Sequence, residues 1–67
     1  MKVIRVRAYR EIRQNNLVLI PEGTPGEIVR TTGTEPTYYT IAFWPEGLHG
    51  VKITVPYLHQ SDFIEVD

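Results

Sequence analysis

The 67-residue chain contains no cysteine, so disulfide bonds and thiolate zinc sites are excluded. Proteins without cysteine are compatible with a reducing compartment, and we expect a cytoplasmic protein. The only two histidines are His49 and His59, whereas a zinc site needs three or four ligands. We therefore expect no metal and no cofactor, with both histidines in surface loops.

Long apolar runs are absent as well. The longest strictly apolar runs are four residues each, at 17–20 and 41–44, whereas a membrane-spanning helix needs about 20 apolar residues in a row. The first residues alternate charged and apolar side chains, which is unlike a secretory signal. We expect a chain that does not enter a membrane.

No arrangement typical of catalysis is recognisable. Ser61 and Asp62 lie near His59, but neighbours on one short turn cannot generally aim at one another as the members of a catalytic triad do. The acidic residues are spread over separate loops, and the turn at 22–26 lacks the lysine and the following helix of a phosphate-binding loop. We therefore expect that the protein is not an enzyme.

The net charge of −1 hides an uneven distribution along the chain. Residues 1–13 contain five basic residues and one acidic residue, whereas residues 14–67 contain two basic and seven acidic residues. The two parts thus carry charges of +4 and −5. Such an asymmetry points to an interaction with a charged partner.

Glycine and proline divide the chain into pieces too short for a stable helical pattern of about 10 to 12 residues, which predicts an all-β protein. Residues 3–9 alternate apolar and polar side chains, as a half-buried strand does. We expect a loop over 10–16, a strand over 17–20, a turn over 21–26, and a strand around Ile28 and Val29 that ends at 32–36.

The longest predicted strand covers 37–44, and a turn follows at 45–50. In the next strand Val51, Ile53 and Val55 are expected to point inward. Residues 56–62 are too short for an α-helix, so we expect a single 3-10 turn there before a last strand at 63–66. Counted together, these segments predict one domain over 1–67, built as a small five-stranded antiparallel barrel whose closure removes exposed edges.

Two segments carry a resemblance at the level of the fold. Residues 20–29 contain a glycine turn followed by a valine-containing strand, which resembles KOW-type and related SH3-like domains. Residues 55–58 with 63–66 are similar to the end of SH3 domains, where a proline and a tyrosine lead into the 3-10 turn. The chain also looks like small accessory subunits with SH3-like folds. This resemblance implies an SH3-like barrel, in which the first strand lies beside the last.

The first candidate site is a basic stripe. Its members fall on the exposed face of the first strand or in the loop after it: Arg5, Arg7, Tyr9, Arg10 and Arg13. These side chains could bind phosphates or an acidic protein surface, with the tyrosine stacking on a base. The alternative is that Arg5 and Arg7 only form cross-strand pairs with Glu65 and Asp67, which contribute about 0 to 1 kcal/mol.

The second candidate is an aromatic group of Tyr38, Trp44 and Tyr57, which are either partner-binding anchors or part of the core. The leading hypothesis is a non-enzymatic protein-interaction module, namely a small subunit, adaptor or assembly factor that meets an acidic protein surface. The second hypothesis is a KOW-like RNA-binding domain, which the overall acidity disfavours. Homodimerisation is compatible with so small a core, but no residue specifies it.

Overall fold

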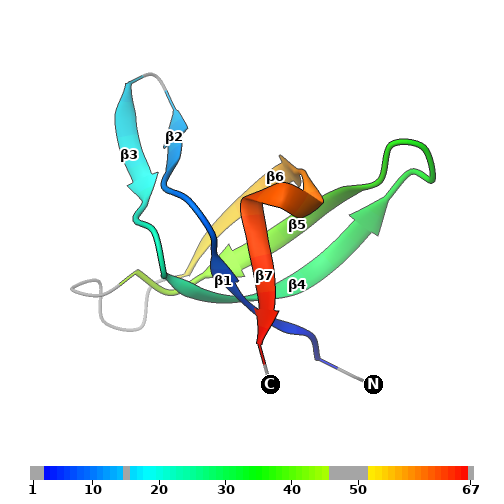
Figure 1. Ribbon diagram of the computed structural model, residues 1–67, viewed down its shortest axis with the longest axis horizontal. Helices are drawn as coiled ribbons and strands as arrows, with labels where there is room; N and C mark the ends of the chain where they lie inside the picture. The colour runs from blue at the N-terminus through cyan, green and yellow to red at the C-terminus, as the bar shows by residue number, and fades with distance from the viewer. Residues whose placement is uncertain (1–2, 15, 46–51, 67) are drawn as a thin grey trace.

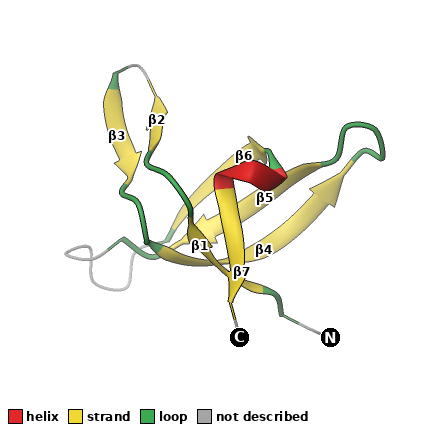
Figure 2. Ribbon diagram, viewed as in Figure 1, coloured by secondary structure: helices red, strands yellow, loops and turns green. Residues whose placement is uncertain are grey.

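The computed structural model describes residues 3–14, 16–45 and 52–66. These residues form an all-β structure, as predicted, whose only helical element is one 3-10 turn. Figure 1 labels the elements and Figure 2 shows their types. In chain order they are β1 (Arg5–Ala8), β2 (Ile12–Gln14), β3 (Leu17–Ile20), β4 (Pro25–Thr32), β5 (Tyr38–Phe43), β6 (Ile53–Leu58), η1 (Gln60–Asp62) and β7 (Phe63–Val66).

Five of these strands form one antiparallel sheet in the order β6-β5-β4-β1-β7, and β2 pairs with β3 in a separate two-stranded sheet. The prediction of five strands in a closed barrel was therefore incorrect for the described residues, where β6 and β7 are the two edges of an open sheet. The chain passes between these edges through η1, without a ladder of hydrogen bonds between them. Consequently the sheet keeps two edges that closure would have removed.

The predicted loop at 10–16 is instead the first half of a hairpin. Arg13 pairs with Val18 and Gln14 with Leu17, so a polar segment takes strand conformation by pairing with the apolar one after it. Asn16, at the turn, has a φ of 66°. Asparagine tolerates this left-handed conformation better than most residues, which favours a reversal here.

The proline and glycine turn ends earlier than predicted, because β4 begins at Pro25. The carbonyl of Pro21 accepts hydrogen bonds from both the amide of Thr24, at 3.2 Å, and its hydroxyl, at 2.6 Å. Gly23 has a φ of +85°, a conformation that glycine adopts without a steric cost. The buried Thr24 side chain is thus satisfied within the turn itself.

A second proline was also misassigned. Residues 56–58 belong to β6, so the predicted turn over 56–62 shrinks to η1. Tyr39 pairs with Leu58 and Ile41 with Val55, which leaves Pro56 and Tyr57 opposite the single residue Thr40. This bulge accommodates a proline because β6 is an edge strand.

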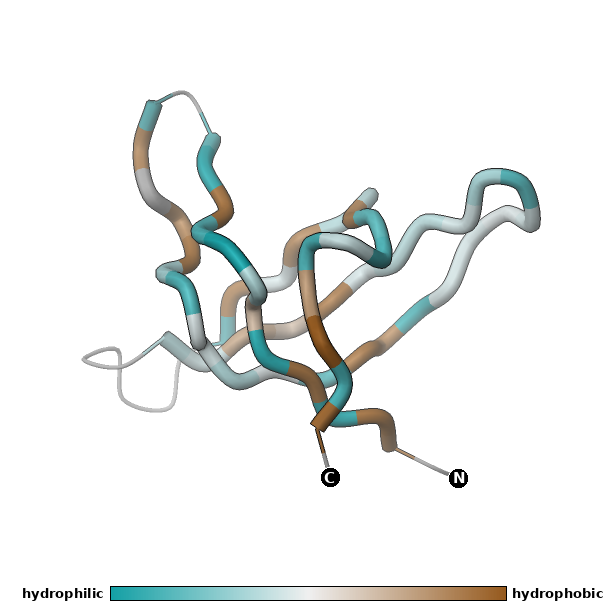
Figure 3. Tube along the Cα trace, viewed as in Figure 1, coloured by the Kyte–Doolittle hydropathy of each residue, from teal (hydrophilic) through white to brown (hydrophobic). Residues whose placement is uncertain are grey.

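The alternating pattern predicts the buried face of β1 correctly, whereas Ile4, just before this strand, is 38% exposed. In β1, Val6 and Ala8 are buried while Arg5 and Arg7 are exposed, and Figure 3 shows the alternation of hydropathy along this strand. The core cluster collects apolar residues from five strands: Val6, Ala8, Ile20, Ile41, Phe43, Val55, Leu58 and Phe63. Ile53 packs against this cluster, in agreement with its predicted inward orientation, whereas Val51 and the turn over 46–50 lie outside the described residues.

Gly26 lies at a close approach of β4 and β5. A Cβ atom at this position would lie 2.8 Å from the carbonyl oxygen of Ala42 and 2.8 Å from Cδ1 of Phe43. Both Ala42 and Phe43 are buried and belong to β5, the strand paired with β4. Only glycine lets β4 approach this part of β5 without displacing it.

Candidate functional site

The outer face of the sheet carries Arg5 and Arg7. In the ladder between β1 and β4, Arg5 lies opposite Glu27 and Arg7 opposite Pro25. On the other side of β1, they lie opposite Val66 and Ile64 of β7. Directly opposed residues of an antiparallel pair project from the same face, so these side chains form rows across three strands.

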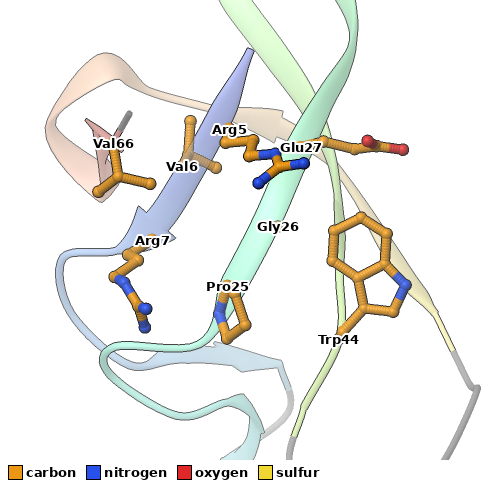
Figure 4. A pocket seen from close by; sticks show the side chains of 8 residues that line it. All are labelled: Arg5, Val6, Arg7, Pro25, Gly26, Glu27, Trp44 and Val66. Carbon is orange, nitrogen blue, oxygen red and sulfur yellow. The ribbon is translucent and has the colours of Figure 1, made fainter. Parts of the chain in front are cut away.

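Trp44 extends this arrangement toward β5. It follows β5 directly, and its amide donates a 2.9 Å hydrogen bond to the carbonyl of Pro25. A groove of about 500 Å³ lies over this part of the sheet, and it is lined by Arg5, Val6, Arg7, Pro25, Gly26, Glu27, Trp44 and Val66. In Figure 4 the Arg5 side chain reaches over β4 on the side where Trp44 stands. The tertiary structure therefore brings part of the basic stripe and one predicted aromatic residue into a single groove.

The groove has an excess of positive charge. The ammonium of Lys52 lies 3.9 Å from Glu27 Oε1 and 5.2 Å from the centre of the Trp44 ring. The lining itself carries two arginines, Arg5 and Arg7, and one carboxylate, Glu27, which Lys52 partly neutralises. Because the Lys52 and Glu27 side chains are both partly exposed, their ion pair contributes at most about 1 kcal/mol.

Among the described residues, neither Arg5 nor Arg7 has a carboxylate within 4.0 Å. The predicted pairing with Glu65 is incorrect, because Glu65 lies opposite Val6 and not opposite an arginine. Asp67, the other predicted partner, lies outside the described residues. Arg7 instead donates from Nη1 to the carbonyl of Gly23 at 3.0 Å, which uses one of its five N–H groups.

The remaining members of the basic stripe lie elsewhere. Arg10 contacts η1, with its Nε 3.7 Å from Asp62 Oδ1 and its Nη2 3.3 Å from the Ser61 carbonyl. Arg13 lies on the β2–β3 hairpin and pairs with Glu11 at 2.7 Å. Tyr9 follows β1 and is 58% exposed, so its ring is accessible. Arg10 and Arg13 already have acidic neighbours and do not line the groove.

Tyr38 and Tyr57 form a second aromatic cluster together with His59. Their rings are 6.0 Å apart in an edge-to-face arrangement, and His59 lies 5.3 Å from Tyr38. Tyr57 is 72% exposed and has a φ of 60°, whereas Tyr38 is half-buried. Tyr38 and Trp44 lie at opposite ends of β5, about 20 Å apart at strand rise, so this cluster is separate from the groove.

Sequence patterns alone did not identify the two residues that lie opposite the arginines. Pro25 falls within the turn predicted over 21–26, and Glu27 is one of the seven acidic residues of 14–67. The pairing of β4 with β1 places both beside the arginines, and the pairing of β4 with β5 brings Trp44 to the same groove. Lys52 lies beside Glu27 and Trp44.

Within the described part of the chain, no group of three or more histidine or acidic side chains could hold a metal ion. No helix over the same residues has the length and apolarity that crossing a membrane requires. Searches among family models, characterised proteins and solved structures gave no match for this chain.

Proposed function

We propose that the chain is a non-enzymatic protein-interaction module that binds an acidic protein surface in the groove between Arg5, Arg7 and Trp44. The observation that carries this proposal is their convergence in one groove of about 500 Å³. Arginine and tryptophan are enriched among the residues that dominate binding energy at protein interfaces. A planar guanidinium also binds a carboxylate through two parallel hydrogen bonds, so two adjacent arginines favour an acidic partner.

The chemistry of the lining supports binding more than catalysis. Arginine, proline and an indole ring supply neither a nucleophile nor a base near neutral pH. The one carboxylate, Glu27, lies close to the ammonium of Lys52. Near the arginines, the exposed Ile64, at 47%, and the partly buried Val66 on the same strand add apolar contact area that a protein partner can cover.

For the fold, we propose an SH3-like arrangement. Three features support it: β1 lies between β4 and β7, a hairpin fills the connection between β1 and β4, and a 3-10 turn precedes the last strand. Such folds serve many functions, so the proposed role depends on the groove and not on this likeness.

The test compares two double variants with the same change in charge. Arg5→Glu/Arg7→Glu reverses both groove arginines, and Arg13→Glu/Arg30→Glu reverses two exposed arginines outside the groove. The tagged proteins are incubated with native lysate over a salt series, with and without nuclease, and the bound partners are identified. We expect a nuclease-resistant protein partner that the groove variant loses and the control variant retains.

The exposed ring of Tyr9 favours a second candidate, a KOW-like RNA-binding role, because bases stack on accessible tyrosines. The carboxylate of Glu27 within the groove disfavours it, since it repels phosphates. Binding that disappears after nuclease treatment and falls steeply with salt would replace our proposal with this second one. Equal binding by the groove variant and the control would remove the groove as the contact surface.

A further inference from the structure

The hydrogen-bonding groups of β1 alternate between its two neighbours. The amide of Ala8 donates to the Thr24 carbonyl at 2.9 Å, and the amide of Ile28 donates to the Ile4 carbonyl at 3.0 Å. Even-numbered residues of this strand therefore bond toward β4. The amide of Tyr9 donates to the Asp62 carbonyl at 2.9 Å, so odd-numbered residues bond toward β7.

This alternation determines which backbone groups of β7 remain free. Arg5 pairs with Val66 and Arg7 with Ile64, so the amides and carbonyls of Val66 and Ile64 point toward β1. Those of Phe63 and Glu65 point to the opposite side. Since β7 is an edge of the sheet, the carbonyl of Phe63 and both the amide and the carbonyl of Glu65 lie along an edge that no described strand covers.

A hollow of about 260 Å³ lies along the same edge. It is lined by Tyr39, Gln60, Phe63, Ile64 and Glu65. Three consecutive residues of β7 line it although their side chains alternate between the two faces, so the hollow follows the edge of the strand. The rings of Tyr39 and Phe63, 5.0 Å apart in an edge-to-face arrangement, give it an apolar wall.

We infer that an extended acidic segment of a partner protein binds as an additional strand, antiparallel to β7. This inference rests on the proposed function, because it assigns a conformation and a side-chain pattern to the same acidic partner. Strand addition uses the free backbone groups of Phe63 and Glu65 for affinity and alternate side chains for specificity. The antiparallel direction is the more stable pairing for a single added strand.

The side-chain pattern follows from the rows across the sheet. Partner residues opposite Ile64 and Val66 project from the outer face, in the rows that continue to Arg7 and Arg5. The partner strand lies about 9.6 Å from β1, two strand spacings away, which two long side chains can bridge. Carboxylates at these two positions meet the arginines, and an apolar side chain opposite Phe63 enters the hollow.

Charge complementarity favours such a partner over a second copy of this chain. If β7 paired with its own copy, the outer face would contribute only Ile64 and Val66, which supply no carboxylate to Arg5 and Arg7. An antiparallel pair of β7 strands would also bring the two copies of Glu65 near each other, and like charges at close range are destabilising.

The test uses a synthetic probe with this pattern, the capped peptide Ser-Glu-Thr-Glu-Leu-Ser, at millimolar concentration with the full chain. Amide hydrogen exchange is measured residue by residue. We expect exchange at Glu65 to slow by about fivefold or more on binding, because its amide gains a hydrogen-bond partner. The same peptide with lysine in place of glutamate should leave this amide unchanged.

Two variants at one position separate the backbone from the side chain. Glu65→Pro removes only the N–H that points to the free edge, a position where edge strands tolerate proline, and we expect binding about tenfold weaker. Glu65→Ala retains this N–H and should bind as tightly as the original chain or more tightly. Ile64→Pro removes an N–H that bonds to β1 and should unfold the protein, which checks the assigned alternation.

The outcomes distinguish this inference from the proposed function. One outcome is glutamate-dependent binding that Arg5→Glu/Arg7→Glu abolishes, without slower exchange at Glu65 or without an effect of Glu65→Pro. That outcome would overturn strand addition and leave the acidic partner of the proposed function unaffected. Equal binding of the lysine peptide would overturn both. Absence of binding at millimolar peptide, or protection of Glu65 that appears only as the chain self-associates, would also overturn the inferred occupant.

Discussion

Replacing Gly26 by alanine tests whether the contact between β4 and β5 is as tight as the structure indicates. The added methyl group would lie 2.8 Å from the Ala42 carbonyl oxygen, 2.8 Å from Phe43 Cδ1 and 3.1 Å from Ile41 Cγ2. One of these atoms belongs to the backbone of the paired strand, and the other two belong to fully buried side chains. Relief requires a shift of the ladder itself.

The cost can be set against the stability of so small a domain. Overpacking a well-packed core destabilises by about 1 to 3 kcal/mol, whereas a core of this size supplies only about 3 to 5 kcal/mol. At this chain length about 1 kcal/mol corresponds to about 4 to 8 °C in Tm. A loss of about 2 kcal/mol therefore predicts that Gly26→Ala lowers the Tm by about 8 to 16 °C.

The assay is thermal unfolding followed by circular dichroism, with Gly23→Ala as the matched control. A Cβ at Gly23 meets nothing within 4 Å, but its φ of +85° makes any side chain strained, so we expect a smaller loss of about 1 kcal/mol. Gly23→Asn should recover part of this loss, because asparagine tolerates positive φ, whereas Gly26→Asn should be worse than Gly26→Ala. A Tm for Gly26→Ala within about 2 °C of the original protein would refute the close approach of β4 and β5.

Three further predictions concern single contacts. Tyr57→Gly should be more stable than Tyr57→Ala by about 0.5 to 1 kcal/mol in urea unfolding, because only the alanine variant keeps the strain of a φ of 60°. This order is the reverse of the usual one in strands, and observing the usual order would contradict the assigned bulge. Thr24→Val should cost about 1 kcal/mol because it removes the hydroxyl that donates to the Pro21 carbonyl at 2.6 Å, while Thr54→Val, at an exposed threonine, should be nearly neutral. Equal stability of the two variants would show that the hydrogen bond from Thr24 contributes nothing. Asp62→Ala should cost about 1 kcal/mol in the same assay, since its carboxylate accepts from the His59 amide at 2.9 Å. Arg10→Ala should cost less than about 0.5 kcal/mol, since the Arg10 side chain is exposed and lies 3.7 Å from Asp62, and a larger loss for Arg10→Ala would contradict this ranking.

Local patterns predicted the strand content of this protein well where one face is buried. The alternation in β1 correctly assigned Val6 and Ala8 to the core and Arg5 and Arg7 to the exposed face. Burial of every second side chain is a local property of a strand, so the sequence contains it without any knowledge of the neighbours.

The errors occurred where pairing overrides local preference. The segment at 12–14, within the predicted polar loop, becomes a strand because β3 supplies its hydrogen bonds. Residues 56–58 extend β6 because Tyr39 pairs with Leu58, even though a proline suggested a turn. The expected contact between arginines and Glu65 failed because it depended on register, and a shift of one residue reverses the face of every side chain.

The amino-acid sequence by itself determined the all-β class, the inward and outward faces of the main strands, and the concentration of arginines near the first strand. Only the tertiary structure decided that Trp44, Pro25 and Glu27 share a groove with Arg5 and Arg7, while Arg10 and Arg13 lie outside it. It also left β7 as an open edge next to these arginines. The physical reason is that side-chain direction follows from the geometry of one strand, whereas the neighbours of a side chain depend on hydrogen bonds between segments far apart in the chain.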